Sequence, residues 1–194
     1  MSSASANAPS TANARLAAAG LTATTILLLT ASLSMLQPLS TDLYLSTLPG
    51  IATYFNASVA SVQSTLWMFI AVFGIWQLIA GPLSDRFGRY PIVVAGAFTY
   101  CAASLLAAIA PSLEVLVVGR VLQAVGACTC LVGARGFVRD LYSPTEGARM
   151  IANAATIMSL APLIGPLIGA TLYVRFGWRS SFAVLATFSL LLAF

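Results

Sequence analysis

Two charged residues stand inside long apolar runs of this chain. Asp42 lies in PLSTDLYL and Arg120 lies in GRVLQAVG. An ionisable residue within a membrane segment marks, by default, a substrate or ion pathway or a binding cavity. The sequence has no histidine, so proton chemistry near neutral pH falls to carboxylates. Asp42 is therefore the candidate proton or substrate site, with Arg120 as its counter-charge and Gln123 one helical turn from Arg120.

The expected helices place these two charges at similar depth. Asp42 comes about six residues, or about 9 Å, before a predicted break at Pro49. Arg120 comes about seven residues, or about 10 Å, after the predicted helix start at Leu113. An ion pair between the two would lower the cost of keeping both in a low-dielectric interior. The alternatives to a functional site are a purely structural ion pair and an aspartate solvated near the outer interface.

The composition indicates a membrane protein. Hydrophobic residues make up 59% of the 194 residues, charged residues only 7%, and the mean hydropathy is +0.94. The apolar segments are continuous and rich in Ala and Leu, which favours helices over the alternating strands of a barrel. We therefore predict an all-α membrane protein with six transmembrane helices, each near the roughly 20 residues of a span. They are expected near 24–48, 61–82, 91–110, 113–134, 150–173 and 178–194.

The arginines predict the orientation. The rule that positive residues stay on the cytoplasmic side favours a cytoplasmic N-terminus. It puts six arginines inside and two outside, namely Arg15, Arg86, Arg89, Arg135, Arg139 and Arg149 against Arg175 and Arg179. Residues 1–20, rich in Ala and Ser, are interpreted as a mobile cytoplasmic tail, with a signal peptide as the competing interpretation.

Several classes of function have little support in the sequence. Cys101, Cys128 and Cys130 lie in apolar runs, which favours packing over a disulfide framework or a metal site. No nucleophile and base pair is apparent, so we expect neither an enzyme nor a cofactor. The arginines are spread over short loops without interleaved aromatic residues, so we expect no nucleic acid partner either.

Two further motifs stand out. GPLSDRFGRYP, residues 81–91, sets charged residues and two glycines between two apolar segments and predicts a tight loop between helices. APLIGPLIGA, residues 161–170, places Ala161, Gly165 and Gly169 on one face, where small residues let another helix approach closely. Pro162 and Pro166 weaken the hydrogen-bond ladder of that segment and allow bending. The motif leaves open whether such a bend serves a conformational cycle.

Together these motifs resemble the major facilitator superfamily. GPLSDRFGRYP looks like the signature between the second and third helices, matched at Gly81, Asp85, Arg86, Gly88 and Arg89. RVLQAVG is similar to the fourth-helix motif, and GPLIGA, with Gly165, Pro166 and Gly169, resembles the fifth-helix antiporter motif. PLSTDLYLSTLPGI, FVRDLY and GWRSSF look like the Bcr/CflA group of drug efflux proteins.

The resemblance implies proton-coupled export of small lipophilic or cationic compounds, chloramphenicol-like drugs among them, by alternating access across the bacterial inner membrane. Asp42 then matches the acid that binds substrate or protons in turn, and Arg120 the arginine that tunes it. Asp85 and Arg89 match residues that hold the inner gate shut, and Asp140 is expected to join them. The implied partners are drugs, protons and the lipid bilayer. The residues neither identify the drug nor separate proton from sodium coupling.

Length is the one large departure from this resemblance. Members of the family have twelve helices in two halves, and this chain reaches Phe194 within the sixth predicted helix. We expect the N-terminal half of such a transporter, which needs a C-terminal six-helix half or, as a second option, another copy of itself. A non-transporting six-helix membrane protein with an assembly or regulatory role is the alternative function.

Overall fold

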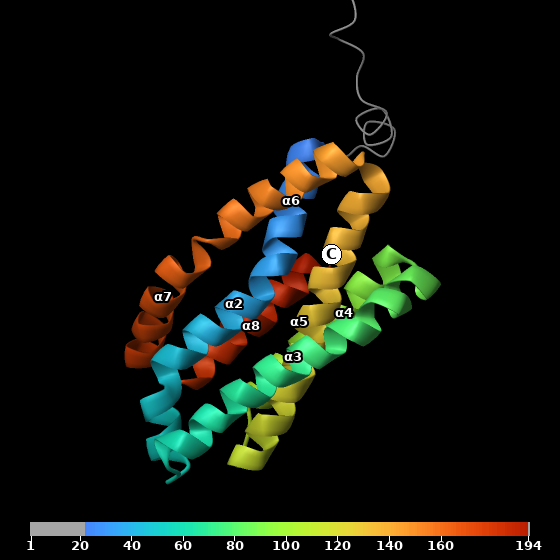
Figure 1. Cartoon of the computed structure of the whole chain (residues 1–194). Coiled ribbons are helices and arrows are strands. Elements are labelled where there is room, and N and C mark those ends of the chain that lie inside the picture. The colour runs from blue at the N-terminus through green and yellow to red at the C-terminus, as the bar shows by residue number, and fades with distance from the viewer. Residues whose placement is uncertain (1–21, 194) are drawn as a thin grey trace, which may run out of the picture.

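The computed structural model describes residues 22–193, and this part of the chain is helical throughout (Figure 1). The predicted tail, residues 1–20, lies outside the described residues. The helices are α2 Ala23–Tyr54, α3 Val59–Phe87, α4 Arg89–Ala108, α5 Leu113–Leu141, α6 Pro144–Met158, α7 Ala161–Phe176 and α8 Arg179–Leu192.

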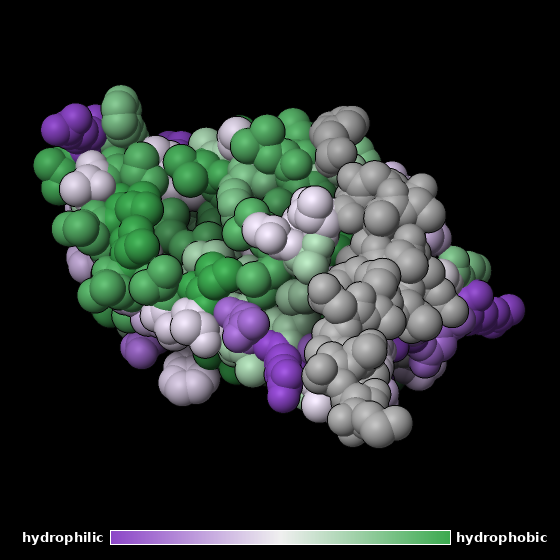
Figure 2. Space-filling view, turned by 90° about the horizontal axis from the view of Figure 1, so that it is seen from above, coloured by the Kyte–Doolittle hydropathy of each residue, from purple (hydrophilic) through white to green (hydrophobic). Residues whose placement is uncertain are grey.

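The helices form a bundle of six membrane crossings, which confirms the predicted fold class. Four single helices and the broken run α6–α7 are long and apolar enough to span a bilayer. α8 is apolar but has 14 residues, or about 21 Å of helix, against a hydrocarbon core of about 30 Å. Apolar side chains cover most of the coloured surface in Figure 2, with hydrophilic residues gathered at its margins.

Chain direction defines two ends of the bundle. We call the end that carries the α3–α4 and α5–α6 connections the Gly88 end. The opposite end, with the α2–α3, α4–α5 and α7–α8 connections, is the Asn56 end. Serine side chains cap the first turns of α3, α5 and α6 by accepting a backbone N–H three residues later, at Ser58, Ser112 and Ser143.

The predicted break at Pro49 is wrong, because α2 continues through this proline to Tyr54. Proline removes one backbone hydrogen bond, but packing on both sides keeps the helix intact. Leu48 and Ile51 are both buried, and Gly50 lies directly against the ring of Tyr173 on α7.

The predicted helix ranges left gaps at 83–90 and 135–149, and these two gaps are wrong, because helices occupy most of both. Gly88 alone separates α3 from α4. Its backbone has φ 91° and ψ 155°, a conformation that glycine adopts readily and residues with a Cβ rarely do. Pro91 fits in the first turn of α4, where its missing N–H would have no helical partner. GPLSDRFGRYP is therefore a sharp corner between two helices.

The fifth predicted segment is two helices and not one. α6 ends at Met158 and α7 begins at Ala161, with a two-residue turn between them (Figure 1). Pro162, in the first turn of α7, has no N–H to offer the carbonyl of Met158. Pro166 lies inside α7 without interrupting it. The interruption therefore falls just before the first proline.

Glycines bring the backbones of α4 and α5 into contact. A Cβ on Gly126 would lie 2.7 Å from both the carbonyl oxygen of Gly96 and the backbone nitrogen of Tyr100. One on Gly119 would lie 3.1 Å from the Cβ of Ala107. Lipid tails are as apolar as the helices, so close van der Waals contact of this kind drives helix association in a bilayer.

Replacing Gly126 with alanine should destabilise the bundle, because the added methyl group must displace the backbone of α4. We expect a loss of about 1–3 kcal/mol, seen as a lower thermal unfolding midpoint of the purified chain in detergent. A Cβ added to Gly74 on α3 would meet no atom within 4 Å, so Gly74→Ala is the matched control and should not lower the midpoint. Equal midpoints for the two variants would contradict the close contact.

Candidate functional site

Arg120 is enclosed in the middle of the bundle with 0% of its surface exposed. Its guanidinium carbon lies 4.4 Å from the ring centroids of both Tyr44 and Phe69. Its Nη1 donates to the backbone carbonyl of Ser40 at 3.2 Å. Aromatic faces attract a cation, the more strongly where water is excluded. Two rings and a carbonyl, rather than a carboxylate, therefore stabilise this charge.

A chain of hydrogen bonds continues from Arg120 to two further helices. Nη1 also donates to Oε1 of Gln123 at 3.1 Å, and Nε2 of Gln123 donates to Oγ of Ser104 at 2.7 Å. On α4, the Tyr100 hydroxyl bonds Oγ of Ser40, which returns the chain to α2. We call Arg120, Gln123, Ser104, Tyr100 and Ser40 the Arg120 network. It links α2, α4 and α5 through buried polar groups.

The predicted ion pair between Asp42 and Arg120 is wrong. Within residues 22–193 the structure has two ion pairs, and Arg89 makes both. The depth was predicted correctly, since Arg120 reaches the carbonyl of Ser40, two residues before Asp42. A helix turns by about 100° per residue, so Ser40 and Tyr44 share the face toward α5. Asp42, two residues from each, points the opposite way.

Asp42 faces α7 instead, on the side of α2 opposite to Ser40 and Tyr44. A Cβ on Gly165 would lie 2.8 Å from the Cβ of Asp42 and 3.5 Å from its Oδ2. One on Gly169 would lie 3.0 Å from the Cα of Leu43. Oγ of Ser46 donates to the carbonyl of Pro166 at 3.2 Å. We call this contact, formed by Asp42, Leu43 and Ser46 on α2 with Gly165, Pro166 and Gly169 on α7, the α2–α7 seam.

The seam explains the small residues of APLIGPLIGA. Ala161, Gly165 and Gly169 are the buried residues of α7. They share one face because they are four residues apart. The Oδ2 atom of Asp42 is buried there and has no hydrogen-bond partner among the described residues. The seam therefore holds a half-buried carboxyl group against a bare stretch of backbone.

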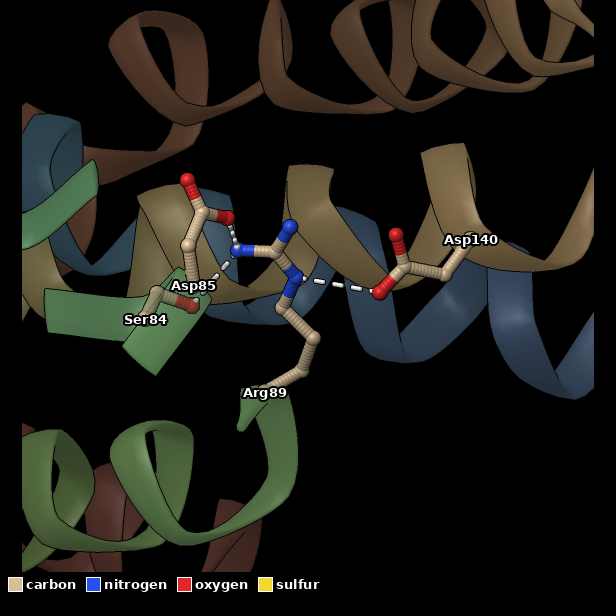
Figure 3. Close-up of polar contacts among 4 residues, drawn as sticks. All are labelled: Ser84, Asp85, Arg89 and Asp140. Carbon is tan, nitrogen blue, oxygen red and sulfur yellow. Dashed lines mark hydrogen bonds and ion pairs between the residues drawn. The ribbon is translucent and has the colours of Figure 1, made fainter. Parts of the chain in front are cut away.

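A second polar cluster lies at the Gly88 end (Figure 3). Arg89, the first residue of α4, contacts Oδ1 of Asp85 at 2.5 Å and donates to Oγ of Ser84 at 3.1 Å, both through Nη1. Its Nε donates to Oδ2 of Asp140 at 3.0 Å. A Cβ on Gly136 would lie 2.7 Å from that Nε. We call Arg89, Asp85, Ser84 and Asp140 the Arg89 cluster; it joins the ends of α3, α4 and α5.

The two aspartates of the Arg89 cluster are open to solvent. The side chains of Asp85 and Asp140 are 66% and 54% exposed, whereas that of Arg89 is 19% exposed. Ion pairs at such exposure contribute about 0–1 kcal/mol. That is little for the fold, but it is enough to shift a balance between two conformations of nearly equal free energy.

The other residues of the corner motif lie outside this cluster. Arg86 is exposed, with its guanidinium carbon 5.5 Å from the centroid of the neighbouring Phe87 ring. Gly88 supplies the corner between α3 and α4. Gly81 faces open space, with nothing within 4 Å of a Cβ there. No close approach within the described chain therefore requires the glycine at this position.

The sequence prediction missed the residues that surround Arg120. Ser40, Tyr44, Phe69 and Tyr100 come from three helices and have no common motif. A partial signal was present, because Ser40 and Tyr44 are four residues apart in the same motif as Asp42 and so share a helix face.

The described part of the chain has no candidate metal site. No set of three or more His, Cys, Asp or Glu residues lies together there in a way that could hold an ion. Cys101, Cys128 and Cys130 are buried as free thiols.

Comparison with known proteins places this arrangement in a family. The sequence matches the family model of the Major Facilitator Superfamily over residues 17–194. The chain therefore belongs to the major facilitator superfamily, a class of membrane transporters and not of enzymes.

Its relatives include resistance proteins of bacteria. The chain is 37% identical over 164 residues to a chloramphenicol resistance protein of Pseudomonas aeruginosa, covering 84% of this chain and 39% of the relative. It is 33% identical over 165 residues to the multidrug resistance protein MdtL of Salmonella paratyphi A, covering 85% and 42%. The chain thus spans about two fifths of the length of these relatives.

Solved structures agree on the fold. A D-xylose–proton symporter superposes with a TM-score of 0.73 at 17% identity, covering 87% of this chain and 46% of the symporter. A bacterial homolog of the human lysosomal transporter Spinster, inward-facing and unoccupied, gives 0.73 at 18% identity, covering 88% and 41%. At such low identity these matches concern the fold alone.

Replacing Arg120 with lysine should destabilise the bundle. A lysine ammonium cannot stack flat between two rings while donating to Ser40 and Gln123, so buried acceptors lose their donor. We expect a loss of about 1–3 kcal/mol in the thermal unfolding of the purified chain. Arg139, exposed on the same helix, supplies the control Arg139→Lys, which should leave the unfolding midpoint unchanged. A stable Arg120→Lys protein would show that the planar fork is not required.

Proposed function

We propose that the chain is one half of a proton-coupled multidrug exporter that works by alternating access in the bacterial inner membrane. The observation that carries this proposal is the position of Asp42. Asp42 is one of five acidic residues in the sequence, and it lies in the middle of a span. Its side chain is half-buried and belongs to neither ion pair of the described residues. The other four lie near helix ends, at Asp85, Glu114, Asp140 and Glu146.

A carboxyl group in that position can take up a proton or attract a cationic drug, but not both at once. Competition between the two for Asp42 would link drug export to proton entry. Sodium in place of the proton is the alternative coupling ion. The class of substrate is supported by the names of the relatives, a chloramphenicol resistance protein and a multidrug resistance protein. The Bcr/CflA subgroup is supported by the resemblance of PLSTDLYLSTLPGI, FVRDLY and GWRSSF.

We infer a different role for Arg120 from that of a direct partner of Asp42. The guanidinium is enclosed on the opposite face of α2 and donates to the carbonyl of Ser40. It therefore acts on Asp42 through the position of α2, as a positioning residue. Gln123 serves the same purpose by accepting a hydrogen bond from Arg120.

A second six-helix half is the partner that we propose. Binding sites in this superfamily lie near the bilayer midplane between two repeated halves. The relatives extend well beyond the matched part, which leaves room for such a half. α3 would suit such a contact, because Trp67, Ile75 and Leu78 are exposed and Gly74 and Gly81 face open space. A second copy of this chain is the alternative partner.

We place the Gly88 end, and with it the N-terminus, on the cytoplasmic side. That end carries more arginines than the Asn56 end, as the positive-inside rule requires. The described arginines near the Gly88 end are Arg86, Arg89, Arg135, Arg139 and Arg149, against Arg175 and Arg179 at the Asn56 end. The Arg89 cluster then lies at the inner gate, where its ion pairs favour the state in which that gate is closed.

In a complete transporter that contains this sequence, Asp42→Asn should abolish drug export driven by a pH gradient. Asparagine keeps the shape of aspartate but cannot bind or release a proton in this range. The amount of protein in the membrane should stay nearly unchanged, as measured by immunoblotting of membrane fractions. Glu114→Gln, the same chemical change at a helix end, should export normally. Undiminished export by Asp42→Asn would remove Asp42 from the mechanism.

The Arg89→Ala variant of the same transporter should populate the inward-open form more. It loses contacts proposed to exist mainly in the state with the inner gate closed, and about 1 kcal/mol changes a population ratio roughly fivefold. Labelling of a cysteine in the cavity from the Asn56 side should fall accordingly. Arg86→Ala, which removes an arginine outside the cluster, is the control. Equal labelling of both variants would mean that the Arg89 cluster has no gating role.

A further inference from the structure

The α2–α7 seam packs closely against one side of the half-buried carboxyl group of Asp42. Gly165 has no side chain, and even a single added carbon there would lie 2.8 Å from the Cβ of Asp42. Oδ2 is buried without a partner among the described residues. A neutral carboxyl group tolerates this packing better than an ionised one, because the buried oxygen of a carboxylate loses water and gains no hydrogen-bond donor or counter-charge here.

No counter-charge of the described residues faces Asp42 from a neighbouring helix. On α5, Arg120 is turned to the opposite face of α2. On α7, Tyr173 and Arg175 lie eight and ten residues beyond Gly165, or about 12 and 15 Å along the helix. The other ionisable arginines and acids of helices packed on α2 lie near the ends of the bundle, at Asp85, Arg86, Glu114, Arg135, Arg139, Asp140, Glu146, Arg149 and Arg179.

α7 is also the helix best placed to move. It begins after the two-residue interruption at 159–160, and it packs in the bundle through its small-residue face. Its large residues Leu163, Leu167 and Val174 are exposed. The seam itself has a single hydrogen bond between the two helices, from Ser46 to the carbonyl of Pro166. The rest of the described contact is van der Waals packing, at Gly165, at Gly169 and between Gly50 and the ring of Tyr173. No further hydrogen bond or ion pair of the described residues would have to break for α7 to separate from α2.

We propose that the protonation state of Asp42 controls the docking of α7 on α2. Close packing of Gly165 against Asp42 means that α7 cannot be docked while Asp42 is ionised. Protonated Asp42 packs against Gly165 and the seam closes. Loss of the proton leaves a charge that requires water, so α7 swings about the α6–α7 interruption and the seam opens. This inference rests on the proposed function, in which Asp42 carries the coupled proton, and adds the helix that responds to it.

The test measures whether the seam opens as Asp42 loses its proton. Leu43 is buried on α2, and a Cβ on Gly169 of α7 would lie 3.0 Å from its Cα, so Leu43→Cys reports separation of the two helices. The chain would be labelled in membrane vesicles with a membrane-permeant maleimide, after the native cysteines are replaced by alanine at Cys101, Cys128 and Cys130. Rates are divided by those of Leu163→Cys on the exposed face of α7, which corrects for the pH dependence of the thiol reaction.

With Asp42 present, the corrected labelling rate should rise about tenfold over a titration from about pH 4 to about pH 9. In Asp42→Asn it should stay low at both pH values, because the side chain remains neutral. Glu114→Gln is the matched control and should keep the full rise. A rise of equal size in Asp42→Asn, no rise with Asp42 present, or fast labelling of Asp42→Asn at both pH values would each overturn the proposal.

The labelling needs neither drug nor gradient, so it separates this inference from the proposed function. A chain that opens its seam with pH but forms no exporter would refute drug export alone. An exporter that depends on Asp42 but shows no pH-dependent labelling at position 43 would refute the control of α7 alone.

Discussion

The buried guanidinium of Arg120 is the constraint on which the arrangement of the helices depends. A cation in the interior of a membrane bundle must be compensated by the groups around it. Here the compensation comes from a carbonyl and a ring on α2, a ring on α3 and an amide on α5, which in turn bonds α4. Four helices are thereby fixed in rotation and depth relative to one charge. The glycine contacts between α4 and α5 bring the backbones of these two helices into close van der Waals contact.

This use of Arg120 separates two tasks on opposite faces of α2. The face with Ser40 and Tyr44 is bound into the rigid interior. On the other face, Asp42 lies against the backbone of α7 at Gly165 and has no ion pair among the described residues. A direct ion pair would have tied the carboxylate permanently to a cation that does not move. Without that pair, the state of Asp42 depends on access of water, protons and cations to the seam, which is the property that a coupled transporter needs.

Sequence patterns predicted the elements of this structure better than their contacts. Continuous apolar runs of about 20 residues identified the six crossings, because a bilayer dictates their length. The spacing of Gly165 and Gly169 predicted a packing face, because helical periodicity alone decides it. Pro49 misled, because tertiary packing can keep a helix intact where local propensity would break it. The pair of Asp42 and Arg120 misled for another reason. Depth follows from counting residues, but the facing direction follows from which helices are neighbours.

The remaining contacts divide the bundle into a rigid part and a part held more weakly. The Arg89 cluster joins the ends of α3, α4 and α5, and glycines lock α4 to α5 along their length. α7 has no such bond network to α2 within the described chain. Its polar contact to α2 is the one hydrogen bond from Ser46, and its helix is interrupted where it meets α6. α7 meets α2 mainly through van der Waals packing at Gly165 and Gly169, with one hydrogen bond and no ion pair of the described residues. Motion is therefore expected at α7, the helix against which the one mid-membrane acid of the described residues is packed.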